Sequence, residues 1–525
     1  MNFLTLVLFL TTCSLSIQQG CSTLGNSFKF KLKRQVPRPT SPYSVLVTGI
    51  GLALVKELLT HKDIGVVIAG VRNPAKASAL KAISDPRLHV VALNVDDDAS
   101  IKRSYKEVEK IVGNRGLNVL VNNAGILLQY STKPGGAIDR PTLMKQFNTN
   151  VFGTVVVTQV YIPLLQKAAQ RMKGDSFSFS RAAVIHTSSI VGSIFNNRGS
   201  EGEYAAYMGS KTAVNQFSRT FAFDLASDHI VSVAFHPGFV STDMTGHSKE
   251  AIAVEKSAKM LVNSFYKLNG KHTFKTMALS FCKSKLINAQ RKELLTHKDI
   301  GVVIAGVRNP AKASALKAIS DPRLHIVALD VDDDASIKQS YKEVEKIVGD
   351  HGLNVLVNNA GILLSYSVKP DGKIDRSILM KQFNTNVFGT VVVTQVYTPL
   401  LQKAAAHKKD DSFSFDRAAV IQISSYMGSI ALNSWGSGAR GIFMSAYRGS
   451  KAALNQFSRT FSHDFKPYHI LSVAIHPGSV QTDMAGPRAA LTAEQSARSL
   501  VNSFYKLNKS HNGNFYKEDL TPLPF

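Results

Sequence analysis

The chain alternates between short, continuously apolar runs and longer segments whose apolar residues recur at helical spacing. The short runs are rich in valine and isoleucine, which is typical of buried β-strands. They lie at residues 45–47, 66–69, 90–93, 119–121, 183–186 and 231–235, and helical patterns such as residues 100–112 and 207–225 lie between them. Because a strand covered on both faces is apolar throughout, this order predicts a parallel sheet with helices on each side.

Right-handed crossovers between successive strands convert such an alternation into a doubly wound α/β fold. In folds of this kind, ligands bind at the carboxyl ends of the strands. We therefore expect the functional residues at the positions where the apolar runs end.

Nearly the whole pattern occurs twice. Residues 56–93 recur at residues 292–329 with a single change, Val90 to Ile326. The correspondence continues toward the C-terminus, with four extra residues in the second copy. The offset of 236 residues (292 − 56) indicates duplicated domains, because solenoid repeats run to about 20–50 residues.

The duplication divides the chain into four predicted parts. An N-terminal extension over residues 1–42 precedes the first domain, residues 43–274, which we call the first repeat. A junction over residues 275–291 leads to the second domain, residues 292–525, which we call the second repeat. With 525 residues, the chain is long enough for each repeat to bury its own hydrophobic core.

The composition, with 44% apolar and 19% charged residues, is that of a globular protein. A net charge of +25 raises the question of a nucleic-acid partner. Ten of these charges lie in residues 1–42 and 270–291, which hold five Lys or Arg each and no acidic residue. Elsewhere basic and acidic residues are mixed and no nucleic-acid motif occurs, so we predict no nucleic-acid partner.

The N-terminal residues 3–10 form an apolar run that is too short to span a bilayer, which takes about 20 residues. The run has the length of a signal-peptide core, but no Lys or Arg precedes it. Two alternatives follow: a signal peptide over residues 1–20 with a secretory or ER location, or a cytoplasmic enzyme. No other segment is long and apolar enough to predict a membrane span. The three cysteines lie in the extension and near the junction, so we predict no disulfide framework and no metal site.

Four short motifs follow the predicted strands in the same order in both repeats. Asn-Asn-Ala-Gly ends the fourth strand, a Ser-Ser pair ends the fifth, Tyr-x-x-x-Lys opens the next helix, and His-Pro-Gly follows the sixth strand. One such motif occurs often by chance, but four in this order, twice, do not. Over about residues 43–270 and 292–525 the chain resembles the short-chain dehydrogenase/reductase family, and most closely the small NADPH-dependent carbonyl reductases of the sniffer and C-factor type. The resemblance implies two tandem Rossmann-like domains and a small-molecule carbonyl substrate.

The Tyr-x-x-x-Lys motif carries the predicted chemistry. Tyr207 and Lys211 are one helical turn apart, so their side chains share a face. A nearby ammonium stabilises a phenolate, so we expect the pKa of Tyr207 to fall from about 10 toward neutrality and the phenol to act as a general acid. The resemblance implies that Ser189 binds the substrate carbonyl, that Lys211 also holds the nicotinamide ribose and that Asn150 anchors a proton-relay water. The matching residues of the second repeat are Asn386, Ser425, Tyr447 and Lys451.

The choice of cofactor is predicted from the end of the second strand. An NAD site prefers Asp or Glu there, whereas this chain has Arg72, and Arg308 in the second repeat. A guanidinium suits the 2′-phosphate of NADP(H), with which it can make a bidentate contact. The further cofactor-binding residues that the motifs and the resemblance indicate are Thr48, Gly49, Gly51, Asn94, Asn122, Ala124, Gly125, Pro237, Gly238 and Thr242 in the first repeat, and Asp330, Asn358, Ala360, Gly361, Pro477, Gly478 and Thr482 in the second.

The glycine-rich turns depart from the family pattern TGxxxGxG. In the first repeat Thr48-Gly49 is followed directly by Ile50-Gly51, as though four residues, including the middle glycine, had been removed. That glycine lets the backbone approach the pyrophosphate. We therefore expect either that the helix from Leu52 onward unwinds or that the turn binds phosphate poorly.

The second repeat lacks both the first strand and the turn, and it is truncated at its N-terminus. A sheet without its central strand leaves unpaired backbone groups. Either residues 277–281 fill the gap or the second repeat is loosened. The first repeat in turn lacks the C-terminal tail that ends the second.

Two functions therefore compete. The first is a tandem NADP(H)-dependent carbonyl reductase in which the first repeat is the active unit. The second is a catalytically impaired scaffold, because both phosphate loops are defective and, taken singly, a tyrosine at a helix start is usually a packing residue and a serine pair after a strand is usually a turn or a cap. Members of the family commonly dimerise through the helices that carry Asn150 and Tyr207, so we expect an intramolecular pseudo-dimer or a homo-oligomer. The segments between the Ser pair and the Tyr differ between the repeats, which predicts different substrates if both bind one.

Overall fold

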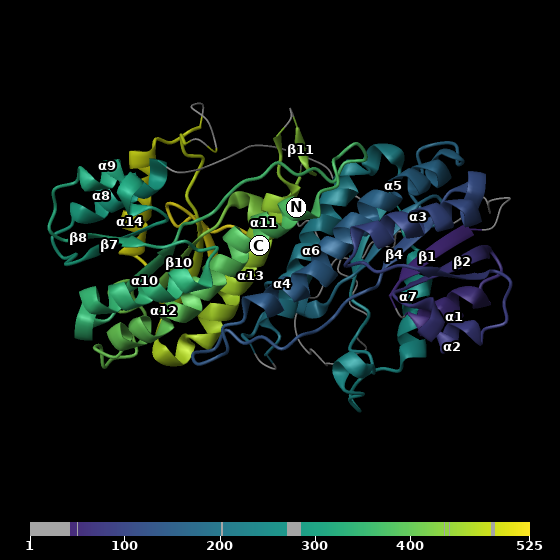
Figure 1. Ribbon diagram of the computed structural model, residues 1–525, viewed down its shortest axis with the longest axis horizontal. Helices are drawn as coiled ribbons and strands as arrows, with labels where there is room; N and C mark the ends of the chain where they lie inside the picture. The colour runs from purple at the N-terminus through teal and green to yellow at the C-terminus, as the bar shows by residue number, and fades with distance from the viewer. Residues whose placement is uncertain are drawn as a thin grey trace, which may run out of the picture.

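The computed structural model describes residues 43–49, 51–200, 203–269, 285–434, 436–439, 442–482, 484 and 489–525. The predicted N-terminal extension, with its alternative signal peptide, and residues 277–281 lie outside the described residues. The two repeats lie side by side, with their sheets at opposite ends of the molecule and helices between them (Figure 1).

The first repeat has a six-stranded sheet in the order β3-β2-β1-β4-β5-β6, and every neighbouring pair is parallel. This is the predicted doubly wound topology, and the strands lie where the apolar runs predicted them. The strands are β1 (Tyr43–Thr48), β2 (Ile64–Val71), β3 (Leu88–Ala92), β4 (Val119–Asn122), β5 (Ala183–Thr187) and β6 (Val231–Phe235). The helices are α1 (Leu52–Thr60), α2 (Ser78–Lys81), α3 (Asp98–Val112), α4 (Arg140–Phe147), α5 (Thr154–Gln170), α6 (Ala205–Asp224) and α7 (Val254–Phe265).

The central strand β1 shows why these runs are apolar throughout. Its residues Val45 and Val47 belong to one hydrophobic cluster, which includes α1 and α7 side chains. Leu46 belongs to a second cluster on the opposite face, together with side chains of α3, α5 and α6. Successive strand residues point to opposite faces, so a sheet covered on both sides needs apolar residues at every position.

The second repeat has most of the same elements, without a counterpart of β1 among the described residues and with the additional strands β11, β12 and β14, and its sheet is divided. Four strands form the sheet β14-β13-β10-β9, and β7 and β8 form a separate pair. Its strands are β7 (Val303–Val307), β8 (Leu324–Ala328), β9 (Val355–Asn358), β10 (Ala419–Ile423), β11 (Gly438–Ala439), β12 (Ile442–Phe443), β13 (Leu471–His476) and β14 (Phe515–Lys517). Its helices are α8 (Lys285–Leu295), α9 (Ser314–Lys317), α10 (Asp334–Val348), α11 (Arg376–Phe383), α12 (Thr390–Ala405), α13 (Ser445–Asp464) and α14 (Ala493–Phe504).

The gap between β7 and β9 lies at the position that β1 occupies between β2 and β4 in the first repeat. Among the described residues no strand pairs with β7 and β9 on the sides that face this gap. Three of the four β9 residues are half-buried, whereas the four residues of the matching strand β4 are buried. The predicted loss of the first strand is confirmed for the described residues, and its consequence is a second repeat with two small sheets.

One side chain takes over a hydrogen bond that the missing strand would make. In the first repeat the Gly49 amide after β1 donates to the Gly70 carbonyl of β2 at 2.9 Å. At the matching carbonyl of the second repeat, Gly306, the guanidinium of Arg291 from α8 donates instead, at 3.2 Å. Arg291 is half-buried there, and burial lowers the pKa of its guanidinium to about 10.

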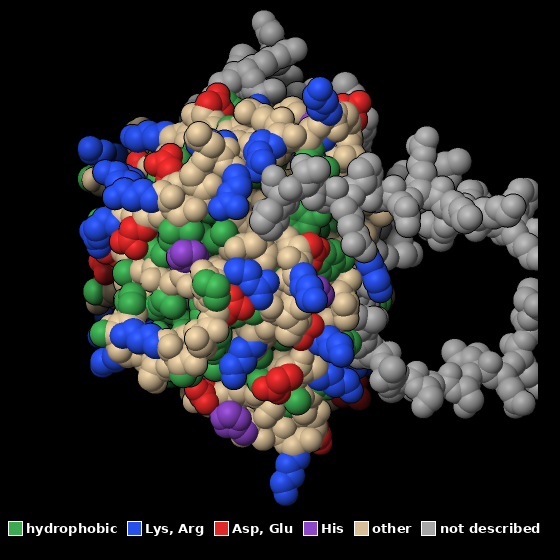
Figure 2. Space-filling view, turned by 90° about the vertical axis from the view of Figure 1, so that its right-hand side faces the viewer, with side chains coloured by type: hydrophobic (Ala, Val, Ile, Leu, Met, Phe, Trp, Pro, Cys, Tyr) green, Lys and Arg blue, Asp and Glu red, His purple; other side chains and the backbone are tan. Residues whose placement is uncertain are grey.

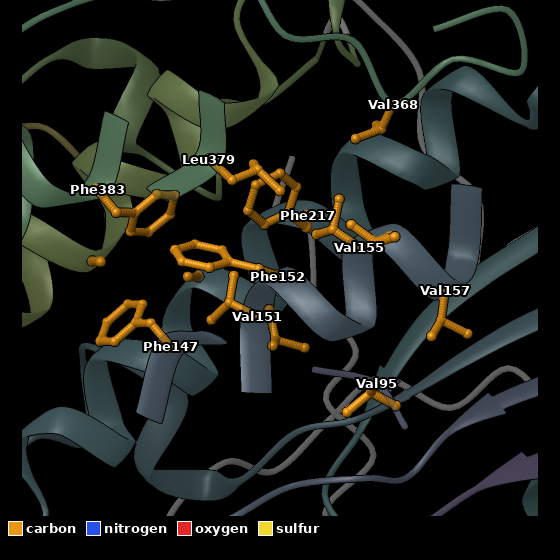
Figure 3. Close-up of a cluster of buried hydrophobic side chains, with 14 of the residues drawn as sticks. Val95, Phe147, Val151, Phe152, Val155, Val157, Phe217, Val368, Leu379 and Phe383 are labelled. Carbon is orange, nitrogen blue, oxygen red and sulfur yellow. The ribbon is translucent and has the colours of Figure 1, made fainter. Parts of the chain in front are cut away.

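The two repeats share one hydrophobic cluster, which contains side chains from both. At its centre Phe147 lies 5.6 Å from Phe383 and 5.2 Å from Phe388, measured between ring centroids, and Phe152 lies 5.2 Å from Phe383. The rings of Phe147, Phe152 and Phe383 lie together between the repeats (Figure 3). Aromatic pairs at such distances stabilise an interface beyond their buried area.

Helices α6 and α13 cross in this shared region, and two glycines allow their close approach. A Cβ atom on Gly209 would lie 2.8 Å from the Phe457 ring, and one on Gly449 would lie 2.6 Å from the Phe217 ring. At the rim of the interface, Arg140 pairs with Asp334 and Arg376 pairs with Asp98, each at 2.6 Å.

The surface of the described residues has mixed charge. Figure 2 shows Lys and Arg side chains interspersed with Asp and Glu on the face in view. One helical run, residues 140–170, has the length and hydropathy of a membrane span, but 78% of its most apolar window is buried inside the protein. A core helix of a globular protein has the same properties, so we assign no membrane span to it.

Candidate functional site

Helix α6 positions the first predicted pair. Tyr207 lies in its first turn and Lys211 one turn later, and the Lys211 ammonium lies 5.5 Å from the centre of the Tyr207 ring. The Lys211 Nζ donates to the carbonyl of Thr187 at 2.7 Å, so the lysine is tied to the end of β5. Lys211 is buried and Tyr207 is half-buried.

The pKa of Tyr207 differs from the sequence-based expectation. Burial raises the pKa of Tyr207 to about 12, although the adjacent Ser189 hydroxyl acts in the opposite direction. Burial also lowers the pKa of Lys211 to about 8. The predicted shift of Tyr207 toward neutrality is therefore wrong for this state, because desolvation penalises the phenolate more than its neighbours stabilise it.

Ser189 and Asn150 lie beside this pair. Ser189 is half-buried and begins the 3-10 turn η4 (Ile190–Gly192) directly after β5. Asn150 lies in a π-helical turn, η3 (Asn148–Gly153), where its amide accepts from Ile126 N at 2.8 Å and donates to Ile126 O at 2.9 Å. The same amide donates to Ser210 Oγ at 3.0 Å. Turns of this kind often occur at functional sites, and here the turn fixes the segment that follows Asn-Asn-Ala-Gly.

The glycine turn after β1 rests on the end of β4. The buried Thr48 hydroxyl accepts from the amides of Asn123 and Ala124 at 3.1 and 3.2 Å. Gly49 has a φ of +74°, and a Cβ atom on it would lie 2.9 Å from Ala124 Cα. Helix α1 begins at Leu52, with Gly51 as its N-cap, so the shortened turn does not unwind the helix.

The other predicted cofactor-binding residues lie at the carboxyl ends of the strands, but they differ in whether other residues already bond their side chains. Arg72 is exposed after β2, and among the described residues it makes no hydrogen bond or ion pair. The Asn94 side chain accepts from Asp96 N at 3.2 Å and so caps a turn. The Asn122 amide donates inward to Thr158 Oγ1 at 2.8 Å, which leaves only its main chain at the strand end.

The His-Pro-Gly motif forms a fixed turn after β6. The Pro237 carbonyl accepts from Ser257 Oγ at 2.7 Å, and Gly238 has a φ of +91°. Thr242 begins the 3-10 turn that follows, where its amide donates to Thr245 Oγ1 at 3.0 Å. Gly125 lies on the opposite side of the site, where a Cβ atom would lie 3.4 Å from Asn150 Oδ1 and 3.6 Å from Lys211 Nζ.

The second repeat reproduces the arrangement with three differences. Lys451 Nζ donates to Ile423 O at 2.7 Å, and Asn386 bonds both the amide and the carbonyl of Ile362. The Ser425 hydroxyl, however, accepts from Met427 N at 3.2 Å and so caps its own turn. Tyr447 is buried in an apolar cluster that contains Met427, Met444 and Met484. Ala360 is exposed where its counterpart Ala124 is covered by the glycine turn.

The remaining predicted residues of the second repeat keep the positions of their counterparts. The Asp330 side chain accepts from Asp332 N at 3.0 Å, and the Asn358 amide donates to Thr394 Oγ1 at 2.9 Å. Arg308 is exposed, and Gly478 has a φ of +82°. The Pro477 carbonyl accepts from Ser496 Oγ, the Thr482 hydroxyl donates to Val480 O, and a Cβ atom on Gly361 would lie 3.3 Å from Asn386 Oδ1.

An open cavity of about 310 Å³ lies beside the first site. Its lining residues are Ile190, Val191, Asn196 and Arg198, all in the segment between Ser189 and Tyr207. Pockets for small ligands begin at about this volume. The segment that differs between the repeats therefore forms the wall of this cavity.

Three polar residues on each of α6 and α13 lie outside the sequence motifs but contact the other repeat. They are Gln216, Thr220 and Asp224 on α6, and Gln456, Thr460 and Asp464 on α13. Each set recurs every fourth residue, and the two sets are identical between the repeats. This spacing places each set on one face of its helix. The spacing is the sequence signal by which these residues could be found.

Comparison with known proteins agrees with this architecture. The short chain dehydrogenase family matches residues 45–253 and, again, residues 289–491. The C-signal protein of Myxococcus xanthus is 35% identical over 173 residues, which are 33% of this chain and 93% of that protein. The carbonyl reductase Sniffer of D. melanogaster is 32% identical, covers 45% of this chain and 94% of its own, and has a TM-score of 0.42.

One solved structure is similar across both repeats. The N-domain of a bacterial malonyl-CoA reductase, solved with NADP, covers 87% of this chain and 95% of its own, with a TM-score of 0.59 and 17% identity. At that identity the likeness shows the fold alone. The fold and the paired strand-end motifs define the class of dinucleotide-binding α/β proteins. The chain belongs to the short-chain dehydrogenase family, as a tandem duplication, and is by family an oxidoreductase.

Proposed function

We propose that the first repeat reduces a small carbonyl compound to an alcohol with NADP(H). The observation that carries the proposal is the grouping of Ser189, Tyr207 and Lys211 beside the open cavity, at the carboxyl end of β5. Bound NADPH would supply a hydride to the carbonyl carbon. The carbonyl oxygen would accept a hydrogen bond from the Ser189 hydroxyl and then the proton of Tyr207, so that carbonyl, hydride and proton together give the alcohol.

The pKa of Tyr207 supports its role as the acid. With a pKa of about 12, the phenol holds its proton at neutral pH until a more basic alkoxide forms next to it. Lys211 places a cationic group on the same helical face, where it would stabilise the phenolate after the proton has left. Asn150 would hold the chain after β4 in place, because its amide bonds both polar groups of Ile126.

The site fits most of a nicotinamide dinucleotide. Gly125 leaves open the space next to Asn150 and Lys211 that a side chain would fill, as close approach of a ribose requires. The exposed guanidinium of Arg72 at the end of β2, which pairs with no other described residue, favours NADP(H) over NAD(H). The weak part is the pyrophosphate end, where Gly49 packs directly against Ala124 and the turn is short.

A second candidate function applies to the second repeat, which we propose is a non-catalytic partner of the first. Its Ser425 hydroxyl is bonded within its own turn, and its Tyr447 is buried among methionines. Its sheet is divided where the cofactor's phosphates would lie in a complete fold. The two repeats would then act as a pseudo-dimer within one chain. The alternative cellular locations stay predictions.

The test is a titration of the full chain with NADPH and with NADH, followed by cofactor fluorescence, and an assay of NADPH oxidation with 4-nitrobenzaldehyde as a probe carbonyl. We expect NADPH to bind more tightly than NADH, and Arg72→Ala to reduce the preference. NADPH oxidation should require the aldehyde. The absence of NADPH binding at high micromolar concentration would show that the chain is the scaffold of the competing hypothesis.

A further inference from the structure

Three residues of α13 hold the cavity segment of the other repeat. The Gln456 amide donates from Nε2 to the Val191 carbonyl at 3.0 Å. One turn later, Thr460 Oγ1 accepts from the Asn197 amide at 2.8 Å, and the Gln456 carbonyl accepts from the same amide at 3.2 Å. After a further turn, Asp464 accepts from the Ser200 amide at 2.8 Å. We call Gln456, Thr460 and Asp464 the α13 ladder.

The matching residues of α6, Gln216, Thr220 and Asp224, make the reciprocal contacts, and we call them the α6 ladder. Gln216 Nε2 donates to Met427 O at 3.0 Å, and Thr220 Oγ1 accepts from the Asn433 amide at 3.0 Å. Asp224 accepts from the Ser437 amide at 3.0 Å. Each helix that carries a Tyr-x-x-x-Lys motif therefore also holds the segment that follows the predicted catalytic serine of the other repeat.

The position of Gln456 is not explained by stability alone. Its side chain is fully buried, and its Oε1 atom has no hydrogen-bond partner among the described residues. A buried amide with one unpaired end is costly compared with an apolar side chain of the same size. The benefit of the amide is the single bond to the Val191 carbonyl, which an apolar residue cannot make.

That bond is made at the site. Val191 lines the cavity, and it lies two residues after Ser189. The same short segment is held from its own repeat by Thr212 and Asn215, which donate to the Gly192 carbonyl at 2.9 and 3.1 Å. Gln456 of the second repeat thus adds to the support of the turn after Ser189. The same turn forms one wall of the cavity.

We infer that Gln456 is a positioning residue for the first repeat's site, and that the second repeat acts as a built-in support for the first. The inference rests on the proposed carbonyl reduction for its kinetic part. A misplacement of about 1 Å at a reacting group costs up to about 100-fold in rate, so the loss of one of several supports should cost less. Losing Gln456 should lower kcat/KM of the first site about tenfold, mainly through kcat, with NADPH binding unchanged.

The first measurement is hydrogen exchange on the full chain, which needs no activity. Gln456→Met keeps the side-chain volume and removes the donor, and it should speed exchange of amides in residues 190–197 about tenfold. Thr460→Val is the second variant, and it should act at residues 197–200. Gln159→Met is the control, because Gln159 is also a buried cross-repeat glutamine but bonds Ser367 O and the Tyr366 hydroxyl, away from this segment. Gln216→Met should affect residues 426–433 instead.

The second measurement is the rate of NADPH oxidation with 4-nitrobenzaldehyde, in a Tyr447→Phe background that leaves only the first site. Gln456→Met should lower kcat/KM and Gln159→Met should not. Equal effects of the two variants on exchange, or faster exchange without any change in kcat/KM, would overturn the inference. If the parent chain oxidises no NADPH, the proposed function fails, and the exchange comparison alone decides whether Gln456 holds the segment.

Discussion

One eight-residue sequence, IGVVIAGV, occurs in both repeats and folds differently in each. In the first repeat all eight residues, Ile64–Val71, form strand β2, and seven of them are buried. In the second repeat only Val303–Val307 form strand β7, and two of those five residues are buried. The local sequence is the same, so the difference comes from the neighbour: β2 pairs with β1, and β7 has no partner on that side among the described residues. Strand formation depends on the sheet as much as on propensity.

The same comparison applies to the sites. Both repeats keep the Ser, Tyr and Lys of the motifs, but Tyr207 is half-buried beside the Ser189 hydroxyl, whereas Tyr447 is buried. In the second repeat, the side chains around Tyr447 close over it. Motif residues are therefore a weaker guide to activity than the surroundings that the rest of the fold gives them.

The largest expected difference is in turnover. Tyr207→Phe removes the proton donor of the first site and should lower aldehyde-dependent NADPH oxidation about 1,000-fold, since a positioned acid contributes about 10²–10⁴-fold. Tyr447→Phe should change the rate less than twofold. Steady-state rates of the two single variants measure this contrast, with cofactor fluorescence as the control for binding. Equal losses would mean that both repeats turn over substrate.

The next difference is in local opening. Amides of β7, at residues 303–307, should exchange with solvent about 100-fold faster than those of β2 at residues 67–71, because an unpaired edge opens at lower free energy. The two peptides have the same sequence, so their intrinsic exchange rates match and serve as an internal control. Arg291→Ala should widen the gap by removing the donor to Gly306 O. Equal protection would indicate that another segment completes the second sheet.

A smaller effect is expected at the first phosphate turn. Inserting a four-residue glycine-containing segment after Gly49 would restore the length of the family pattern and supply free amides to the pyrophosphate. One or two added hydrogen bonds correspond to about tenfold tighter NADPH binding. The same insertion after Gly174, in an exposed turn with open space around it, is the control. An unchanged affinity after both insertions would show that the short turn suffices.

The last prediction concerns pH and the α6 ladder. Burial raises the pKa of Asp224 to about 6, against the lowering effects of Ser437, Lys369 and Arg448. The unfolded chain gives up this proton at a lower pH than the folded chain. The carboxyl group therefore favours folding below about pH 4, and that contribution is lost as the pH rises through 6.

The shift corresponds to at most about 3 kcal/mol, or several degrees in Tm. Asp224→Asn does not titrate, so its Tm relative to the parent chain should rise between pH 4 and pH 7. Thermal unfolding at both pH values measures the change. A difference in Tm that is independent of pH would contradict the assignment.

The fold was largely predictable from the sequence, because buried parallel strands leave continuous apolar runs that the structure reproduces within a few residues. The strand-end motifs likewise led to the family. The pKa of Tyr207 was not predictable from its spacing to Lys211, since the dominant cause is burial, which the spacing does not show. The contacts of the two ladders were not predictable either: the spacing places a glutamine, a threonine and an aspartate on one helix face, and only the packing of α6 against α13 shows that five of the six residues are buried.

The shared core between the repeats has a consequence for how the protein behaves at low abundance. Two separate subunits joined by the same aromatic contacts would come apart on dilution, and their mutual support would be lost with them. Here one chain carries both halves, so the second half meets the first at a local concentration that the linker sets and dilution does not change. A unit whose own sheet is incomplete can therefore remain paired with its intact neighbour in a cell that makes only a few copies.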